Sequence, residues 1–368
     1  MEKNKGYYQV DGVLFRNKVK AILEAQKKDL PVTYHYNDQW WDAADWTKEP
    51  QDPLHDIYVQ RARQLRDSYE TLVLRYSGGA DSYNILRTFI DNDIKLDYVV
   101  TNVMQDIIYQ DFETHPGNIE RLSISIPTLE KLKAQGADFE LVISDISRFL
   151  LTIDSPEWIF RIDHAPRFSI AEIINSQAMK HEIYYPIDKP TTAVIMGIDK
   201  PYVYTQHSKI YTFQVPDFLP CHLDFHNNMA YEPFYYTADM PALPIKQVHV
   251  IKKYLKNHPE IPLTSFNSIY LKRFLVPLLY PKYYHFSPGD PLPYWEPHSL
   301  QLEQMGQFTN QPRGSNDGAE IHKTPVYKNW CDGIDLADRL IERKYKYEDS
   351  IWTNGLATMH TKRRWVGK

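Results

Sequence analysis

The sequence is poor in the residues on which several common kinds of protein depend. Only two cysteines occur among 368 residues, Cys221 and Cys331, and neither has a second Cys or a paired His nearby. A disulfide framework or a structural zinc site is therefore not expected. No stretch of about 20 apolar residues is present to span a membrane. Residues 2–5 are polar or charged and lead into no apolar leader, so we expect a cytoplasmic protein.

The chain also lacks the excess of positive charge that is typical of nucleic-acid binders. Its formal net charge is −5, which argues against a general polyanion binder. One basic cluster, Lys362-Arg363-Arg364-Trp365 with Lys368, lies near the end, and we expect a solvated tail there rather than a nucleic-acid contact. Tyrosine is abundant, with 27 residues, and most of these are expected to pack in the core.

No Walker-type phosphate loop is present, because no Gly is followed after four residues by Gly-Lys-Ser or Gly-Lys-Thr. A different glycine pair occurs instead. The apolar run 71–76 predicts a strand, Ser77-Gly78-Gly79-Ala80-Asp81-Ser82 follows at once, and 83–91 continues at helical spacing. Two glycines allow a tight turn that presents N–H groups to an anion, and the helix N-terminus adds partial positive charge. The segment therefore predicts an anion-binding loop.

Strand and helix signals alternate on both sides of this loop. Residues 97–102 and 139–143 predict strands on either side of a helix over 119–134, and 192–196 predicts a further strand, while 202–213 favours a hairpin. Such alternation requires crossover connections. The predicted fold class is α/β, a mainly parallel Rossmann-like sheet with helices on both faces.

Three parts of the chain are predicted from these patterns. Residues 1–70 form an N-terminal helical element, 71–215 form the α/β domain up to a Pro-rich boundary, and 216–368 form a mostly helical C-terminal region that serves as a substrate or lid region. Residues 281–318, rich in Pro, Gly, Asn and Gln, are expected to be a long loop or lid. Helices in the C-terminal region are predicted at 246–257, 265–279 and 333–346.

The segment Ser77–Ser82 matches the Ser-Gly-Gly-x-Asp-Ser signature of the PP-loop, or N-type, ATP pyrophosphatases at all five fixed positions. The chain resembles this superfamily, which includes asparagine synthetases, GMP synthetases and NAD synthetases and has a HUP-type, adenine nucleotide alpha hydrolase-like fold. The resemblance implies that Ser77, Gly78, Gly79 and Ser82 hold the ATP phosphates that become pyrophosphate. It further implies that Asp81 positions Mg²⁺, which proteins usually bind through one or two carboxylates and phosphate oxygens.

Two weaker binding candidates follow the other predicted strands. Asn102 stands where the chain of this family passes the adenosine, and it fits a turn residue equally well. Gly197-Ile198-Asp199-Lys200 follows the strand 192–196, where many PP-loop enzymes carry a Gly-x-Asp segment. Lys200 would neutralise charge on the leaving phosphates, and Asp199 would bind metal or substrate; a turn with solvated charges is the alternative. Weaker candidates for an acceptor pocket are Asp145, Arg161, Asp163, His164, Arg167, Thr237 and Asp239, and a solvated helix face is expected at Lys246, His249 and Lys253.

The resemblance implies an enzyme that adenylates an acceptor and converts ATP to AMP and pyrophosphate. Two isolated cysteines argue against the sulfur-transferring members, so an amide- or C–N-forming ligase acting on a small molecule or nucleobase is expected. The alternative is an ATP-binding regulatory or nucleic-acid-interacting protein without turnover. The acceptor, the nitrogen source and the oligomeric state, a homo-oligomer included, stay open, as do the roles of 1–70 and 216–368.

Overall fold

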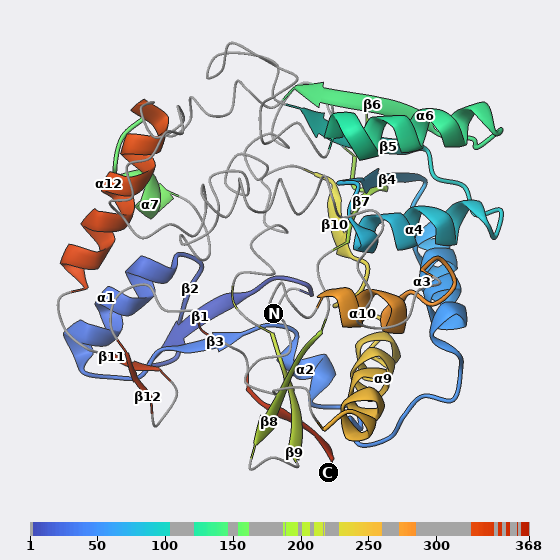
Figure 1. Cartoon of the computed structure of the whole chain (residues 1–368). Coiled ribbons are helices and arrows are strands. Elements are labelled where there is room, and N and C mark those ends of the chain that lie inside the picture. The colour runs from blue at the N-terminus through green and yellow to red at the C-terminus, as the bar shows by residue number, and fades with distance from the viewer. Residues whose placement is uncertain are drawn as a thin grey trace.

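The computed structural model of the chain shows a parallel sheet surrounded by helices and three smaller antiparallel sheets (Figure 1). No helix of the described part has the length and apolarity to cross a lipid bilayer. The structure describes residues 3–103, 121–145, 154–161, 187, 189–197, 201–206, 210–215, 217, 228–259, 272–284, 325–341, 345–347, 351–353, 359 and 362–367.

The central sheet has five parallel strands in the order β10-β7-β4-β5-β6. Its middle strand β4 is a continuous apolar run in which Leu72, Val73 and Leu74 are fully buried, as expected for a strand covered on both faces. This sheet confirms the predicted α/β class. The strands are β4 (Thr71–Arg75), β5 (Tyr98–Val103), β6 (Glu140–Asp145), β7 (Thr192–Met196) and β10 (Ala230–Pro233).

The strand order reverses direction between β4 and β7. After β4 the chain adds β5 and β6 on one side, and β7 and β10 follow on the other side. Connections that leave neighbouring strands in opposite directions open a crevice at their carboxyl ends, and open α/β sheets bind ligands there. The predicted loop 77–82 and the segment that begins at Gly197 follow these two strands, so both begin at this crevice.

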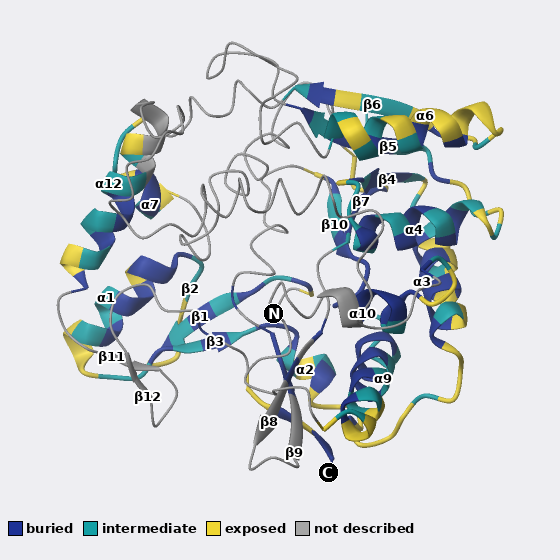
Figure 2. Ribbon diagram, viewed as in Figure 1, coloured by how far each residue is buried: buried dark blue, intermediate teal, exposed yellow. Residues whose placement is uncertain are grey.

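Helices connect the strands as the periodicity predicted. Helix α4 (Ala80–Ile90) follows β4 and buries Ile85, Leu86 and Phe89 at helical spacing (Figure 2). A short π-helix, η1 (Arg121–Ser125), leads into α6 (Ile126–Ala134) between β5 and β6. Helix α3 (Leu54–Ser68) packs against both α4 and β4. The strand β4 and the loop after it are thus held between packed elements.

The N-terminal region contains strands that the sequence pattern did not indicate. An antiparallel sheet in the order β2-β1-β3 packs with α1 (Lys18–Lys28), and the short α2 (Asp38–Trp41) follows it. The predicted helical element therefore also contains strands, which the sequence did not reveal because strands of three or four residues are too short to show an alternating pattern. They are β1 (Tyr7–Val10), β2 (Val13–Phe15) and β3 (Thr33–His35).

The region after residue 215 contains short strands besides the predicted helices. Strand β10 joins the central sheet although it lies beyond the predicted boundary at residue 215. The last predicted helix ends at Leu340 rather than at Lys346, which belongs to strand β11. The hairpin predicted over 202–213 is confirmed, and of 281–318 only 281–284 is described. The elements are β8 (Tyr202–Gln206), β9 (Ile210–Gln214), α9 (Ala242–Asn257), α10 (Lys272–Leu279), α12 (Pro325–Leu340), β11 (Tyr345–Tyr347), β12 (Ile351–Thr353) and β13 (Arg364–Gly367), with α7 (Trp158–Arg161) before them.

The basic cluster near the end is not simply a solvated tail. Arg364 is buried in β13, which pairs with β9. Its Nη2 lies 2.6 Å from Asp38 Oδ1 and 3.2 Å from Asp42 Oδ1, and its guanidinium carbon lies 5.2 Å from the ring centroid of Trp41. The expectation was therefore wrong for Arg364, which attaches this strand to α2 through an ion pair and a cation–π contact.

A buried ion pair joins α3 to the edge of the central sheet. Arg61 Nη2 donates to Glu232 Oε2 over 2.7 Å and to the carbonyl of Pro233 over 3.1 Å. Tyr69 donates to Oε1 of Glu232 over 2.6 Å, and the Asn4 amide donates to Oε2 over 3.4 Å. Because Arg61 and Glu232 are almost completely excluded from water, removal of one partner would leave the other charge uncompensated.

We expect Arg61→Met to lower the free energy of unfolding by about 3–5 kcal/mol, the cost typical of breaking a buried ion pair. Arg63→Met makes the same change at an exposed position of the same helix and is expected to stay within about 0.5 kcal/mol of wild type. Urea unfolding followed by tryptophan fluorescence measures both. Equal losses in the two variants would contradict the assigned importance of the Arg61–Glu232 pair.

Candidate functional site

The two glycines of the loop have different conformations. The backbone of Gly78 has φ of +86°, in the left-handed region that side chains disfavour. Gly79 is extended, with φ −74° and ψ 163°, and is the N-cap residue of α4. Before them, the Tyr76 N–H donates to the carbonyl of Val100 over 2.8 Å, which fixes the start of the loop against β5. The chain therefore turns at Gly78 and enters the helix immediately after Gly79.

The two serines of the motif hold the loop in this shape. Ser82 Oγ accepts a hydrogen bond from the Ser77 N–H over 3.2 Å and donates to the carbonyl of Gly79 over 3.1 Å. Ser77 Oγ accepts from the Gly79 N–H over 3.3 Å and lies 3.2 Å from Ser82 Oγ. Since Ser82 is buried, its hydroxyl acts within the loop, while the phosphate contacts implied for the motif residues stay a prediction.

Gly197 lies against the first turn of α4. A Cβ atom added there would lie 3.2 Å from Ser82 N, 3.4 Å from the carbonyl carbon of Asp81 and 3.1 Å from Ile85 Cδ1. The end of β7 thus packs on the helix N-terminus, and the absence of a side chain keeps it close. This contact places Gly197 and the motif loop together at one edge of the sheet. Asp199 and Lys200 lie outside the described residues, so their roles stay predictions.

Asn102 lies in β5, next to the strand that carries the loop. It pairs in register with Ser144 of β6 and is half-buried. The interpretation of Asn102 as a turn residue was therefore wrong. It stands two residues beyond Val100, whose carbonyl accepts a hydrogen bond from the start of the loop, and its adenosine role stays a prediction.

Asp81 is held through two different oxygen atoms. The Tyr280 hydroxyl donates to its carboxylate oxygen Oδ1, and the Tyr235 hydroxyl donates to its backbone carbonyl over 2.8 Å. The Asn84 amide in turn donates to the Tyr235 hydroxyl over 3.0 Å. Sequence reasoning missed both tyrosines, because nothing in the spacing of Tyr235 and Tyr280 links them to residue 81. The only signal was the unusual tyrosine content.

Tyr58, Tyr235 and Tyr280 form a buried cluster behind Asp81, which we call the tyrosine cluster. The ring centroid of Tyr235 lies 5.7 Å from that of Tyr58 and 5.9 Å from that of Tyr280. Burial raises the pKa of all three phenols well above the usual value, and the negative charge of Asp81 raises it further. These hydroxyls therefore remain protonated in the physiological range and act as hydrogen-bond donors.

An arginine also contacts the loop. Arg121, at the start of η1, donates through Nη1 to the carbonyl of Ser77 over 2.6 Å. It brings a guanidinium group to the side of the loop that faces β5. Neither the motif nor the helical pattern indicated this residue, because the 17 positions before it, 104–120, separate it from β5.

The weaker polar candidates have structural partners instead. Lys246 Nζ lies 2.7 Å from Glu49, and a ring nitrogen of the buried His249 lies 3.0 Å from the carbonyl of Trp46. The expected solvated face was therefore wrong for these two, which hold the segment 46–50 against α9.

Of the weaker candidates for an acceptor pocket, Asp239 pairs with Lys3, and Arg161 pairs with Asp154. Three others, Asp163, His164 and Arg167, lie outside the described residues. Within the described ranges no group of three or more His, Cys, Asp or Glu is arranged to hold a metal ion.

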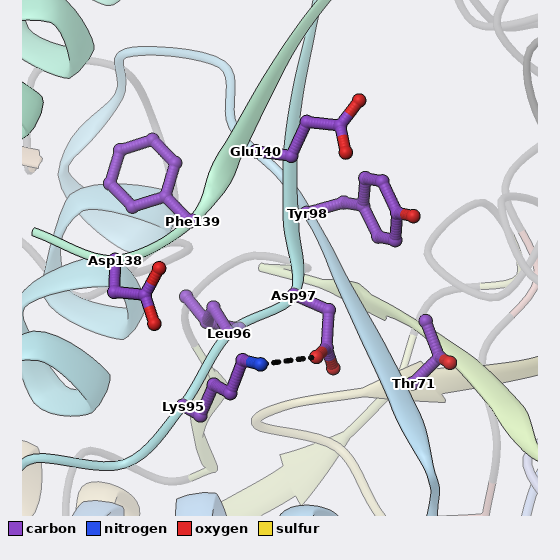
Figure 3. Close-up of a pocket in the computed structure, with 8 residues that line it drawn as sticks. All are labelled: Thr71, Lys95, Leu96, Asp97, Tyr98, Asp138, Phe139 and Glu140. Atoms are coloured by element: carbon purple, nitrogen blue, oxygen red, sulfur yellow. Dashed lines mark ion pairs between the residues drawn. The ribbon is translucent and has the colours of Figure 1, made fainter.

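A hollow of about 330 Å³ lies at the opposite, amino edge of the sheet (Figure 3). Asp97 in its wall accepts hydrogen bonds from Arg66 over 2.7 Å and from the Leu72 N–H over 2.8 Å, and pairs with Lys95 at 3.6 Å. These contacts join the starts of β4 and β5, which suits a role in stability. Its lining residues are Thr71, Lys95, Leu96, Asp97, Tyr98, Asp138, Phe139 and Glu140.

Comparison with protein-family models, curated proteins and solved structures gives no match for this chain. The motif and the geometry of the crevice are therefore the features that bear on function. Within that crevice, the loop after β4 and the glycine after β7 are in contact, and one carboxylate lies in the first turn of the helix.

The two loop glycines give a matched test of this geometry. Gly78→Ala is expected to lower the free energy of unfolding by about 1–2 kcal/mol, because a side chain is disfavoured at positive φ. Gly79→Ala places the same methyl group on an extended backbone and is expected to cost less. Urea unfolding of both variants measures the difference, and a larger loss at Gly79 would contradict the described loop conformation.

Asp97 predicts a pH effect on stability. Burial alone would raise its pKa, but the hydrogen bonds from Arg66 and Leu72 and the nearby positive charges hold the pKa below its usual range. Its contribution is therefore present above the unfolded pKa and is lost as pH falls through the folded value. Asp97→Asn should lower the unfolding free energy most at neutral pH, with the difference from wild type shrinking below about pH 4. A constant difference across pH would contradict this.

Proposed function

We propose that the chain is a PP-loop ATP pyrophosphatase that adenylates an acceptor and releases pyrophosphate. The observation that carries the proposal is the loop Ser77–Ser82, placed between β4 and α4 at the switch point of a parallel sheet. The full signature, the left-handed Gly78 and the close approach of Gly197 occur together there. The motif and its tertiary position both favour a phosphate ligand.

The residues present fit ATP with a divalent cation. The first N–H groups of α4 have no carbonyl partner within the helix and carry its partial positive charge, so they would bind phosphate oxygens. Asp81 supplies a carboxylate at this same helix turn, and one carboxylate with phosphate oxygens is a usual Mg²⁺ donor set. Bound Mg²⁺ would neutralise charge that develops on the phosphates. The bare backbone at Gly197 leaves the side of this turn free of a side chain.

In the proposed reaction, an acceptor oxygen attacks the α-phosphorus of ATP. The new oxygen–phosphorus bond forms as the bond from the α-phosphorus to the α,β-bridging oxygen breaks, and pyrophosphate leaves with that electron pair. A nitrogen nucleophile then displaces AMP from the adenylate to form an amide or another C–N bond. Lys200 would stabilise the charge on the leaving pyrophosphate, Asp199 would bind metal or substrate, and Asn102 would contact the adenosine. The acceptor would be a small molecule or a nucleobase.

ATP labelled at the α-phosphate tests the reaction. The label is incubated with Mg²⁺, the protein and an extract of metabolites and nucleic acids, and the products are separated. Label in AMP or an adenylate is expected for wild type and for Asp67→Asn, which removes an exposed carboxylate. We expect Asp81→Asn to be slower by about 100-fold or more, because it removes the charge that would hold the cation.

Three other outcomes would contradict the proposal. Label in ADP would show that ATP is cleaved between its β- and γ-phosphates rather than between its α- and β-phosphates. ATP binding that is indifferent to Mg²⁺ and to Asp81→Asn, with no product from any extract, would favour a regulatory ATP-binding protein. Tight, salt-sensitive RNA or DNA binding that ignores ATP would favour a nucleic-acid-interacting protein.

A further inference from the structure

The C-terminal region reaches the loop carboxylate directly. Tyr280 directly follows α10, and its hydroxyl donates to Oδ1 of Asp81. Its side chain is fully buried, so the contact is formed away from bulk water. Hydrogen bonds to a charged group are stronger than those between neutral groups, and more so where water is excluded.

The end of α10 that carries Tyr280 is itself fixed from behind. The Tyr58 hydroxyl donates to the carbonyl of Leu279 over 2.9 Å, and the Gln247 amide of α9 donates to the Tyr58 hydroxyl over 3.1 Å. Tyr235 holds the backbone carbonyl of Asp81 from another direction. Contacts from α3 and α9 thus fix the end of α10, and the ring of Tyr235 packs 5.9 Å from the ring of Tyr280.

We propose that Tyr280 is a positioning residue for Asp81, and that the C-terminal region thereby completes the nucleotide site. This inference rests on the proposed ATP pyrophosphatase function. The hydrogen bond restricts rotation of the carboxylate about its Cβ–Cγ bond and so presents it to the cation in one orientation. Ligating carboxylates are commonly oriented in this way by a partner that does not touch the metal.

Binding of Mn²⁺ gives a test that does not depend on turnover. Mn²⁺ affinity is measured by electron paramagnetic resonance in the presence of an ATP analogue with a non-cleavable α,β bridge. Tyr280→Phe keeps the ring and removes only the hydroxyl, and we expect it to weaken Mn²⁺ binding by about 10- to 100-fold. The Mg²⁺ concentration that gives half-maximal pyrophosphate release should rise in parallel.

Tyr283→Phe is the matched control. Tyr283 follows the same helix, but its ring packs edge-on against Tyr83 and the negative group beside its hydroxyl is Asp91. This variant is expected to bind Mn²⁺ as wild type does. Thermal unfolding of both variants distinguishes a change in the orientation of the Asp81 carboxylate from a loss of folded protein.

A double-mutant cycle completes the experiment. If Tyr280 acts only through Asp81, adding Tyr280→Phe to Asp81→Asn changes Mn²⁺ affinity no further. Independent effects in this cycle, or wild-type Mn²⁺ affinity in Tyr280→Phe, would overturn the positioning role and leave the ATP site intact. Absence of nucleotide-dependent Mn²⁺ binding by the wild-type protein would instead overturn the proposed function and this inference with it.

Discussion

The parallel pairing of β4 with both β5 and β7 is the constraint on which the rest of the molecule depends. Since all three strands run the same way, their carboxyl ends meet at one edge, and the connections after β4 and β7 leave in opposite directions. This pairing brings the loop of motif residues and Gly197 to the same edge, where they are in contact. The amino edge, by comparison, is joined by Asp97 and its partners, which link strand starts.

The site is a local structure supported by distant ones. Its serines form hydrogen bonds within the loop, so the turn is shaped by the motif itself. The orientation of Asp81, in contrast, depends on hydroxyls from Tyr235 and Tyr280. A charged group at a helix N-terminus has several rotamers available, and contacts from outside the helix select one of them. The aromatic content of the chain, otherwise used in packing, thus acts at the site as well.

The same arrangement explains how the terminal regions belong to the α/β unit. Glu232 of β10 binds Arg61 of α3 and Asn4 in the interior, and Arg364 of the last strand binds Asp38 of α2. Buried charges require partners because their desolvation is costly. These ion pairs therefore specify how the ends of the chain pack, and they connect the predicted N-terminal part to the predicted C-terminal part.

The sequence by itself determined the features that depend on short-range order. The strands at 71–75 and 192–196, the glycine turn and the helix after it follow from apolar runs, backbone freedom and periodicity, which act within a few residues. Only the tertiary structure decided that β10 joins the sheet, that short N-terminal strands pair, that Arg364 is buried, and that Tyr235 and Tyr280 hold Asp81. The contacts of β10, Arg364, Tyr235 and Tyr280 join residues more than 30 positions and often more than 150 positions apart, and side-chain pairs at such separations leave no periodic trace in a single sequence.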